Sequence, residues 1–73
     1  GHALGAGGAI EAALCWLALR GLAPVPPHVT EPVDTALAPF DLPRRGDRRT
    51  IRTALSSSFA FGGSNAAVLL RRI

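Results

Sequence analysis

The residues Phe61-Gly62-Gly63-Ser64 separate two strand-like segments and give this chain its clearest structural pattern. Before them, residues 51–57 alternate well enough to form a strand, and after them residues 65–72 contain a continuous apolar run. A continuous run of this kind is typical of a strand in a sheet that is covered on both faces. Paired glycines in such a position favour a tight turn. The pattern therefore predicts two strands joined by that turn.

A helix is predicted near the start of the chain. Residues Leu4 to Leu19 are rich in good helix formers, and Gly21 lies where a helix stop is expected. The segment is apolar nearly all round, with Glu11 as its only charge, and a helix of this kind is normally buried on most sides by a large protein. Each glycine weakens a helix by about 1 kcal/mol relative to alanine, so glycines imply close packing of the backbone against a neighbour. The first turns contain Gly5, Gly7 and Gly8.

The segment between the helix and the first strand is broken by proline and rich in arginine. Six prolines punctuate the middle of the chain, so residues 23–40 are expected to be extended or irregular. The arginines that follow are interpreted as a solvated loop, and the alternative is a contact with phosphate or an acidic protein. No aromatic residue lies among them to stack on a single-stranded nucleic acid, so we predict no nucleic-acid partner. The cluster consists of Arg44, Arg45, Arg48, Arg49 and Arg52.

Length and composition limit the chain to one small domain. A chain of 73 residues buries only about 60% of its unfolded surface, and the 48% hydrophobic content is normal for a globular protein. The sequence contains no Met and begins inside a glycine-rich motif, so we expect it to be a piece of a longer protein. It shows no basic leader and no apolar run of membrane-spanning length, so we expect a cytoplasmic protein without a membrane partner. One cysteine excludes an internal disulfide.

Few residues of the chain could carry chemistry. His2 precedes the glycine-rich helix start, where backbone N–H groups and the helix dipole favour a neutral imidazole that donates one hydrogen bond. Cys15 lies in the middle of the helix among apolar residues, where a thiol is most often a small buried hydrophobe and not a nucleophile. Together with His28, these residues lack the spacing of metal ligands, and Ile10 occupies the third glycine position of a dinucleotide-binding fingerprint. We therefore predict neither a metal nor a cofactor.

Two glycine-punctuated motifs, considered together, identify a family. They are Gly1-His2-Ala3-Leu4-Gly5-Ala6-Gly7-Gly8-Ala9 and Ser58-Phe59-Ala60-Phe61-Gly62-Gly63-Ser64-Asn65, in this order. With them the chain resembles the last part of a β-ketoacyl-acyl-carrier-protein synthase, a condensing enzyme of the thiolase superfamily, over nearly its whole length. The resemblance implies an α/β fold in which residues 1–73 form the incomplete C-terminal part of a thiolase-like domain. That domain is layered αβαβα, and this part of it would hold one buried helix and a few strands.

The resemblance assigns roles to particular residues. His2 matches one of two active-site histidines that help to decarboxylate the malonyl extender and to stabilise the enolate that forms. Glu11 matches a glutamate in a polar network with a lysine, which would precede Gly1. Phe61 matches a gating phenylalanine whose backbone N–H forms part of the oxyanion hole. The gating loop would consist of Phe59, Ala60, Phe61, Gly62 and Gly63.

The chain departs from the family's patterns at a few positions. The common loop pattern Asn-Ser-Phe-Gly-Phe-Gly-Gly-Thr-Asn has Asn, Gly and Thr where this chain has Ser57, Ala60 and Ser64. Alanine resists a positive φ, so we expect a stiffer or differently shaped gate at Ala60. In the first motif Gly7 replaces an alanine, which is a smaller departure. Thiolases fit less well, because they carry proline in place of Ala3 and end on a Cys-x-Gly-Gly-Gly motif.

The resemblance also implies an activity for the whole protein. It would be an acyltransferase, a 3-oxoacyl-ACP synthase, that performs decarboxylative Claisen condensation of an acyl thioester with malonyl-ACP in fatty acid or polyketide-type biosynthesis. The acyl carrier protein would be its partner, docked with help from the arginine cluster, and the assembly would be a homodimer or heterodimer. The nucleophilic cysteine and the second histidine would lie outside this chain, which we expect to be inactive and poorly folded alone.

Two other functions remain open from the sequence. The first is a non-catalytic partner subunit of the same fold, such as the chain-length factor of a polyketide synthase. Such subunits lack the nucleophile, and the presence of His2 argues mildly against this reading. The second is a small independent basic module that binds nucleic acid, which the nearly all-apolar helix disfavours.

Overall fold

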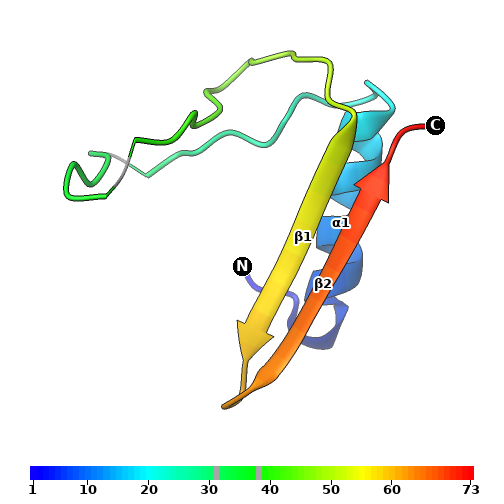
Figure 1. Cartoon of the computed structure of the whole chain (residues 1–73), viewed down its shortest axis with the longest axis vertical. Helices are drawn as coiled ribbons and strands as arrows, with labels where there is room; N and C mark the ends of the chain where they lie inside the picture. Colours follow the sequence, from blue (N-terminus) through cyan, green and yellow to red (C-terminus); the bar gives the residue numbers. More distant parts are fainter. Residues whose placement is uncertain (31, 38) are drawn as a thin grey trace.

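The computed structural model describes residues 1–30, 32–37 and 39–73 and places one helical segment against a two-stranded sheet. Helix α1 runs alongside the hairpin, and the residues between α1 and the first strand extend to one side of it (Figure 1). The predicted combination of helix and strands is therefore confirmed, as one helix on one sheet. In chain order the elements are the 3-10 helix η1 (Leu4–Ala6), α1 (Gly7–Leu19), β1 (Thr53–Ala60) and β2 (Ser64–Arg71).

The hairpin has the tight turn that the sequence predicts. Strands β1 and β2 pair antiparallel, from Thr53 opposite Arg71 to Ala60 opposite Ser64. Only residues 61–63 lie between the strands, and their φ angles are 51°, 65° and 126°. Glycine adopts positive φ readily, whereas a phenylalanine at position 61 does so at a steric cost. Because the turn is so short, β1 continues to Ala60 instead of ending at residue 57 as predicted.

Helix α1 begins later than predicted and ends where predicted. Leu4 has a φ of 52°, in the left-handed region, so the regular helix cannot run through it and starts at Gly7. At the other end Gly21 has a φ of 69°. The backbone N–H groups of Gly21 and Leu22 donate back to the carbonyls of the last turn, at 3.1 and 2.9 Å. This arrangement is a Schellman motif, in which glycine in the left-handed conformation ends the helix.

The prediction of a buried helix is wrong for this chain. Ala18 and Leu19 are buried, but Ile10, Leu14 and Trp16 keep 48%, 44% and 50% of their surface exposed. The physical reason is that the hairpin covers one side of α1, and no second layer lies on the other side within the described residues. The outer face of the sheet is open as well, so the described chain shows a single helix layer and a single sheet layer.

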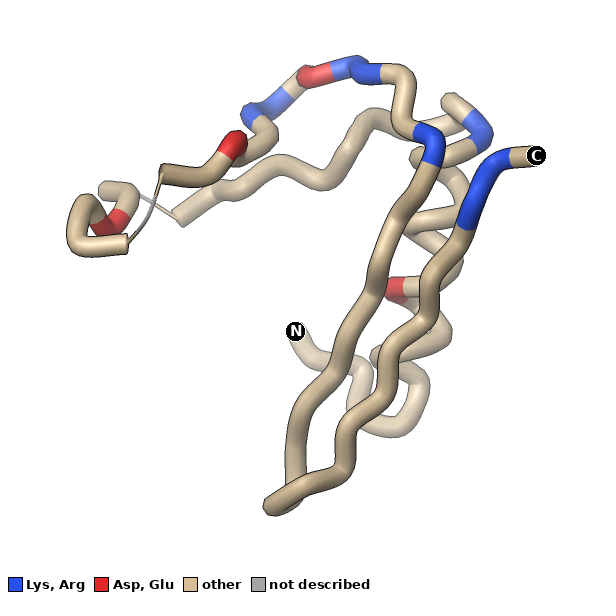
Figure 2. Tube along the Cα trace, in the orientation of Figure 1, with Lys and Arg blue, Asp and Glu red and all other residues tan. Residues whose placement is uncertain are grey.

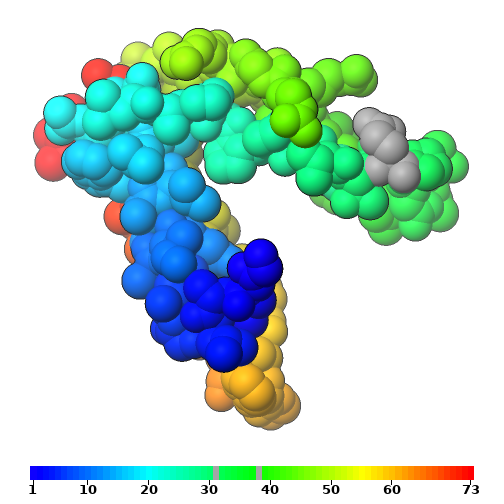
Figure 3. Space-filling view, turned by 180° about the vertical axis from the view of Figure 1, so that it is seen from behind, coloured from blue at the N-terminus to red at the C-terminus, as the bar shows by residue number. Residues whose placement is uncertain are grey.

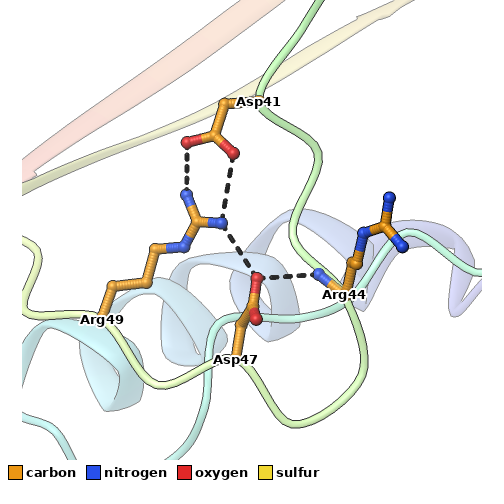
Figure 4. Close-up of polar contacts among 4 residues, drawn as sticks. All are labelled: Asp41, Arg44, Asp47 and Arg49. Atoms are coloured by element: carbon orange, nitrogen blue, oxygen red, sulfur yellow. Dashed lines mark hydrogen bonds and ion pairs between the residues drawn. The ribbon is translucent and has the colours of Figure 1, made fainter.

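Ionic contacts organise the loop that precedes β1. The Arg49 guanidinium donates to both carboxylate oxygens of Asp41, at 2.6 and 3.2 Å, and to Asp47 at 2.9 Å (Figure 4). The same Asp47 carboxylate accepts a hydrogen bond from the backbone N–H of Arg44 at 2.9 Å. Elsewhere in the loop, the backbone N–H of His28 donates to the carbonyl of Pro43 at 2.8 Å and ties its two arms together. The solvated arginine loop is thus present, but the charge of Arg49 is already paired.

A second group of arginines gathers at the end of the molecule where α1 ends (Figure 2). Arg52 precedes β1 and pairs through its carbonyl with the backbone N–H of Arg72, at 2.8 Å. The Arg72 guanidinium donates to the carbonyl of Leu19 at 3.5 Å, and the Arg20 guanidinium lies 5.7 Å from the centre of the Trp16 ring. Cations in these places complement the negative end of the helix dipole. Of these contacts, the one from Arg72 to Leu19 joins the hairpin to the end of α1.

No helix in the described part of the chain combines the length and the apolar character needed to cross a bilayer.

The ion pairs of the loop set the acid sensitivity of that loop. Arg49 lowers the pKa of Asp41, and the backbone N–H of Arg44, followed by Arg49, lowers the pKa of Asp47 below the ordinary value of 3.8. A carboxylate with a depressed folded pKa stabilises the folded loop above that ordinary value. This stabilisation is lost as the pH falls through the still lower folded pKa values, so the contribution of the two carboxylates is fully present at neutral pH.

Replacing Arg49 by lysine should loosen residues 41–49, because an ammonium cannot form the forked contact with Asp41 while it also reaches Asp47. We expect several-fold faster hydrogen–deuterium exchange of the peptide that covers this stretch, measured by mass spectrometry at pH 7. The matched control is Arg48→Lys, because Arg48 forms no ion pair within the described residues. Equal exchange rates in the two variants would show that the network does not order the loop.

Candidate functional site

His2 lies against the first turn of α1. A Cβ placed on Gly7, the first residue of the helix, would lie 3.0 Å from Cε1 and 3.4 Å from Nδ1 of the His2 ring. Gly7 is buried, although most residues around it are exposed. The N-terminal residues, dark blue in Figure 3, lie on the open side of the helix, facing the hollow that the loop leaves beside it. The imidazole is therefore placed at the positive end of the helix dipole, as the sequence predicts.

The close packing predicted for the three helix-start glycines applies to one of them. Within the described residues, a Cβ on Gly5 or on Gly8 would meet no atom within 4 Å. Only Gly7 has a neighbour close enough for a Cβ to disturb, and that neighbour is the His2 ring. The helix-start glycines are therefore not equivalent, and the sequence pattern alone gave no means of ranking them.

Glu11 joins the helix to the sheet. Its Oε2 accepts a hydrogen bond from Oγ of Ser56 in β1, at 3.2 Å, although the two residues are 45 positions apart in sequence. The Glu11 side chain is exposed, whereas Ser56 is half-buried. Both residues line a mostly apolar cleft of about 470 Å³ between α1, the loop and β1, and the half-buried Cys15 lines it as well. The sequence analysis did not identify Ser56, because nothing in a run of three serines marks the one that faces the helix.

The turn that carries Phe61 is the strained part of the site. Phe61 combines a φ of 51° with a side chain that is 96% exposed, and Phe59 is exposed too. Ala60 is the last residue of β1 and is paired with Ser64 in the sheet. Ala60 does not adopt a positive φ, which begins one residue later at Phe61, and the expectation of a stiffer or differently shaped gate stays a prediction. The steric cost of the turn falls on Phe61 and not on Ala60.

These residues share a region but do not touch one another in the described structure. The start of the helical segment and the hairpin turn lie toward the same end of the molecule (Figure 1). The side-chain hydrogen bonds of the described residues do not link His2 to Glu11 or to Phe61. No three His, Cys, Asp or Glu side chains gather to hold a metal ion within residues 1–30, 32–37 and 39–73. The arrangement offers a carboxylate–hydroxyl pair that lines the apolar cleft and, away from the residues that line it, an imidazole at the helix start and a strained turn.

Comparison with known proteins gives one consistent result. The chain is 47% identical over 99% of its length to 3-oxoacyl-[acyl-carrier-protein] synthase 2 of Rhizobium meliloti (strain 1021). It is 40% identical over all of its length to the mitochondrial 3-oxoacyl-[acyl-carrier-protein] synthase of Arabidopsis thaliana, and 34% identical to 3-oxoacyl-[acyl-carrier-protein] synthase 1 of Escherichia coli (strain K12). These matches cover 17%, 16% and 18% of the relatives, so the chain spans about a sixth of their length. No family model matches the chain, and no solved structure matches it significantly.

Replacing Ser56 by alanine should weaken the attachment of α1 to β1, because Glu11 loses its partner across the cleft. We expect a loss of about 0.5–1.5 kcal/mol in the free energy of unfolding, measured by denaturant titration of the full protein that carries this chain. Ser58→Ala is the matched control, since Ser58 lies on the same face of β1 and is exposed. A loss no larger in Ser56→Ala than in Ser58→Ala would mean that the hydrogen bond adds nothing to stability.

Proposed function

Because this chain is homologous over nearly its whole length to 3-oxoacyl-[acyl-carrier-protein] synthases, we propose that the protein that carries it is a condensing enzyme of that kind. Its substrates are an acyl thioester and malonyl-ACP, and its product is a 3-oxoacyl-ACP. The observation that carries the proposal is the alignment, which covers 99% of this chain and 17% of the relative, together with the two motifs. One motif contains His2 and the other contains Phe61. The acyl carrier protein is then the macromolecular partner.

The reaction breaks one carbon–carbon bond and forms another. The bond between the malonyl carboxyl carbon and the α-carbon breaks, CO2 leaves, and the electron pair remains as an enolate with charge on the thioester oxygen. The α-carbon then attacks the carbonyl carbon of the acyl thioester and forms a tetrahedral oxyanion. When the oxyanion collapses, the carbon–sulfur bond breaks, and the thiolate that carried the acyl group leaves and takes up a proton. Negative charge therefore develops on the thioester oxygens in both halves of the reaction, and fixed hydrogen-bond donors aimed at those oxygens give the largest rate effect.

His2 is the donor that this chain supplies for the enolate oxygen. Its ring lies on the first turn of α1, where the helix dipole is positive and stabilises nearby negative charge. A ring nitrogen held in place by the helix start can donate without reorganising as the charge develops.

Glu11 is a positioning residue in this proposal. Glu11 lies on α1, which begins after His2, and its carboxylate accepts a hydrogen bond from Ser56 of β1. The hydrogen bond fixes α1, and with it the His2 end of the helix, against the strand that leads to the hairpin turn. A lysine from outside the described chain would complete the polar network around this carboxylate.

Phe61 supplies the second element of the site, the oxyanion hole and the gate. Its left-handed backbone turns the peptide at the end of β1, and its ring is exposed. A strained turn with two following glycines can exchange between conformations more easily than a regular strand. Phe61 therefore opens and closes the path of the acyl chain, while its backbone N–H stabilises the tetrahedral oxyanion.

The proposed activity also accounts for the open apolar surfaces. Ile10, Leu14 and Trp16 on α1 and Leu69 on β2 are exposed in the described chain. Contiguous apolar surfaces of soluble proteins are normally covered by another part of the protein or by a partner. We propose that the remaining layers of a thiolase-like fold cover these surfaces in the full protein. The residues that would form its dimer interface lie outside this chain.

The test is the release of CO2 from malonyl-ACP by the full protein. We expect His2→Ala to lower the rate by about 10²–10³-fold, as for loss of one donor to a developing oxyanion. His28→Ala is the matched control, because His28 is an exposed histidine of the loop, and it should keep the native rate.

Three results would be informative beyond the expected one. A native rate for His2→Ala would show that His2 takes no part in the chemistry. A folded native protein that releases no CO2 and forms no 3-oxoacyl product would replace the condensing enzyme with a non-catalytic partner subunit. Equal losses in His2→Ala and His28→Ala would point to a general effect on folding.

A further inference from the structure

Leu4 has a left-handed backbone two residues after His2. Its φ is 52°, and among the described non-glycine residues only Phe61 shares a positive value. Residues with a Cβ are disfavoured in this region, and bulky side chains are rare there. The neighbouring Gly5 could adopt a positive φ freely but does not. The steric cost therefore falls on a leucine although a glycine follows it directly.

Packing of the leucine side chain does not explain this conformation within the described chain, because 77% of its surface is exposed. The backbone around Leu4 is held by hydrogen bonds instead. The N–H of Ala6 donates to the carbonyl of Ala3 at 3.1 Å, and the N–H of Gly7 donates to the carbonyl of Leu4. Backbone strain that its surroundings hold in place is concentrated at functional sites.

The turn at Leu4 decides where the residues before it lie. An unbroken helix would carry His2 onward along the axis of α1, about 7.5 Å beyond Gly7 at 1.5 Å per residue. With Leu4 left-handed the chain turns back instead, and a Cβ placed on Gly7 would lie 3.0 Å from Cε1 of the His2 ring. The place of the imidazole on the first turn of α1 thus follows from the φ of Leu4.

We propose that Leu4 is a positioning residue, whose left-handed backbone turns the chain so that the His2 imidazole lies on the first turn of α1. The inference rests on the proposed function, in which His2 donates a hydrogen bond to the enolate oxygen. The turn at Leu4 then sets the direction from which this donor approaches the oxygen. Because the effect lies in the backbone, the φ that a residue tolerates at position 4 matters more than its hydrophobicity.

Tolerance of a positive φ predicts the order of the variants at position 4. Valine is β-branched and resists the left-handed region more strongly than leucine, whereas glycine adopts it without steric cost. In Leu4→Val the turn should therefore open and the His2 ring should move. Donation to the enolate oxygen matters only as charge develops, whereas substrate binding uses many contacts, so kcat should fall while KM stays nearly unchanged.

The first experiment measures kcat and KM for decarboxylation of malonyl-ACP by variants of the full protein. A misplacement of about 1 Å can cost about 10²-fold in rate, so we expect Leu4→Val to lower kcat about 10- to 10²-fold. Leu4→Gly should keep kcat close to the native value. The matched control is Leu37→Val, the same replacement at an exposed leucine without a positive φ, and it should keep the native rate.

Two results of this experiment would overturn the proposal. A native kcat in Leu4→Val would show that the left-handed backbone is not needed for the reaction. Equal losses of kcat in Leu4→Val and Leu4→Gly would show that the leucine side chain acts, and not the backbone.

A second experiment needs no activity and compares glycine with alanine at two positions. Alanine is more stable than glycine in a helix, whereas glycine is more stable than alanine where φ is positive. We expect Leu4→Gly to have a higher midpoint of thermal unfolding than Leu4→Ala. The matched control is Ala13→Gly on the exposed side of α1, which should lower the midpoint. A midpoint of Leu4→Gly at or below that of Leu4→Ala would show that position 4 is not held left-handed and would overturn the inference.

The experiments separate the inference from the function on which it rests. If His2→Ala decarboxylates malonyl-ACP at the native rate, the proposed function of His2 fails, whatever the unfolding midpoints show. If His2→Ala is slow but Leu4→Val matches Leu37→Val in kcat, the function stands and the positioning role of Leu4 fails.

Discussion

The antiparallel pairing of β1 with β2 is the constraint on which the rest of this structure depends. The turn at residues 61–63 fixes the register, and the register decides which side chains of β1 face α1. Ala54 and Ser56 face the helix and are half-buried, while Leu55 between them is exposed. A slip by one residue would turn Ser56 away from the helix and break its contact with Glu11. The turn thus sets the register and, through it, the attachment of the helix.

The helix start contributes a second, more local constraint. Because Leu4 is in the left-handed conformation, the regular helix begins only at Gly7, and the residues before it fold back onto the first turn. The His2 ring then lies on Gly7 instead of pointing into solvent along the helix axis. The His2 imidazole thus lies at the positive end of α1, and the Glu11 carboxylate, further along the same helix, is anchored to the sheet through Ser56. The spacing between the two follows from the length of the helix and not from a direct contact.

The sequence could predict the features that depend on nearby residues. The hairpin turn and the end of α1 follow from glycines whose role is local, Gly62–Gly63 and Gly21. The start of α1 was misplaced, because propensity does not reveal a left-handed Leu4. The hydrogen bond from Ser56 to Glu11 could not be predicted, since it joins two segments whose separation only the folded chain sets. Burial of α1 was overestimated for a different reason: the apolar pattern is real, but the described chain provides a cover for one side only.

The most direct test of the account is the position of the His2 ring relative to a bound thioester. A crystal structure of the full protein with a non-hydrolysable malonyl thioester analogue should place a ring nitrogen of His2 about 3 Å from the thioester oxygen, with the ring still seated on Gly7. A thioester oxygen held by other donors, with His2 turned away from it, would contradict the central claim.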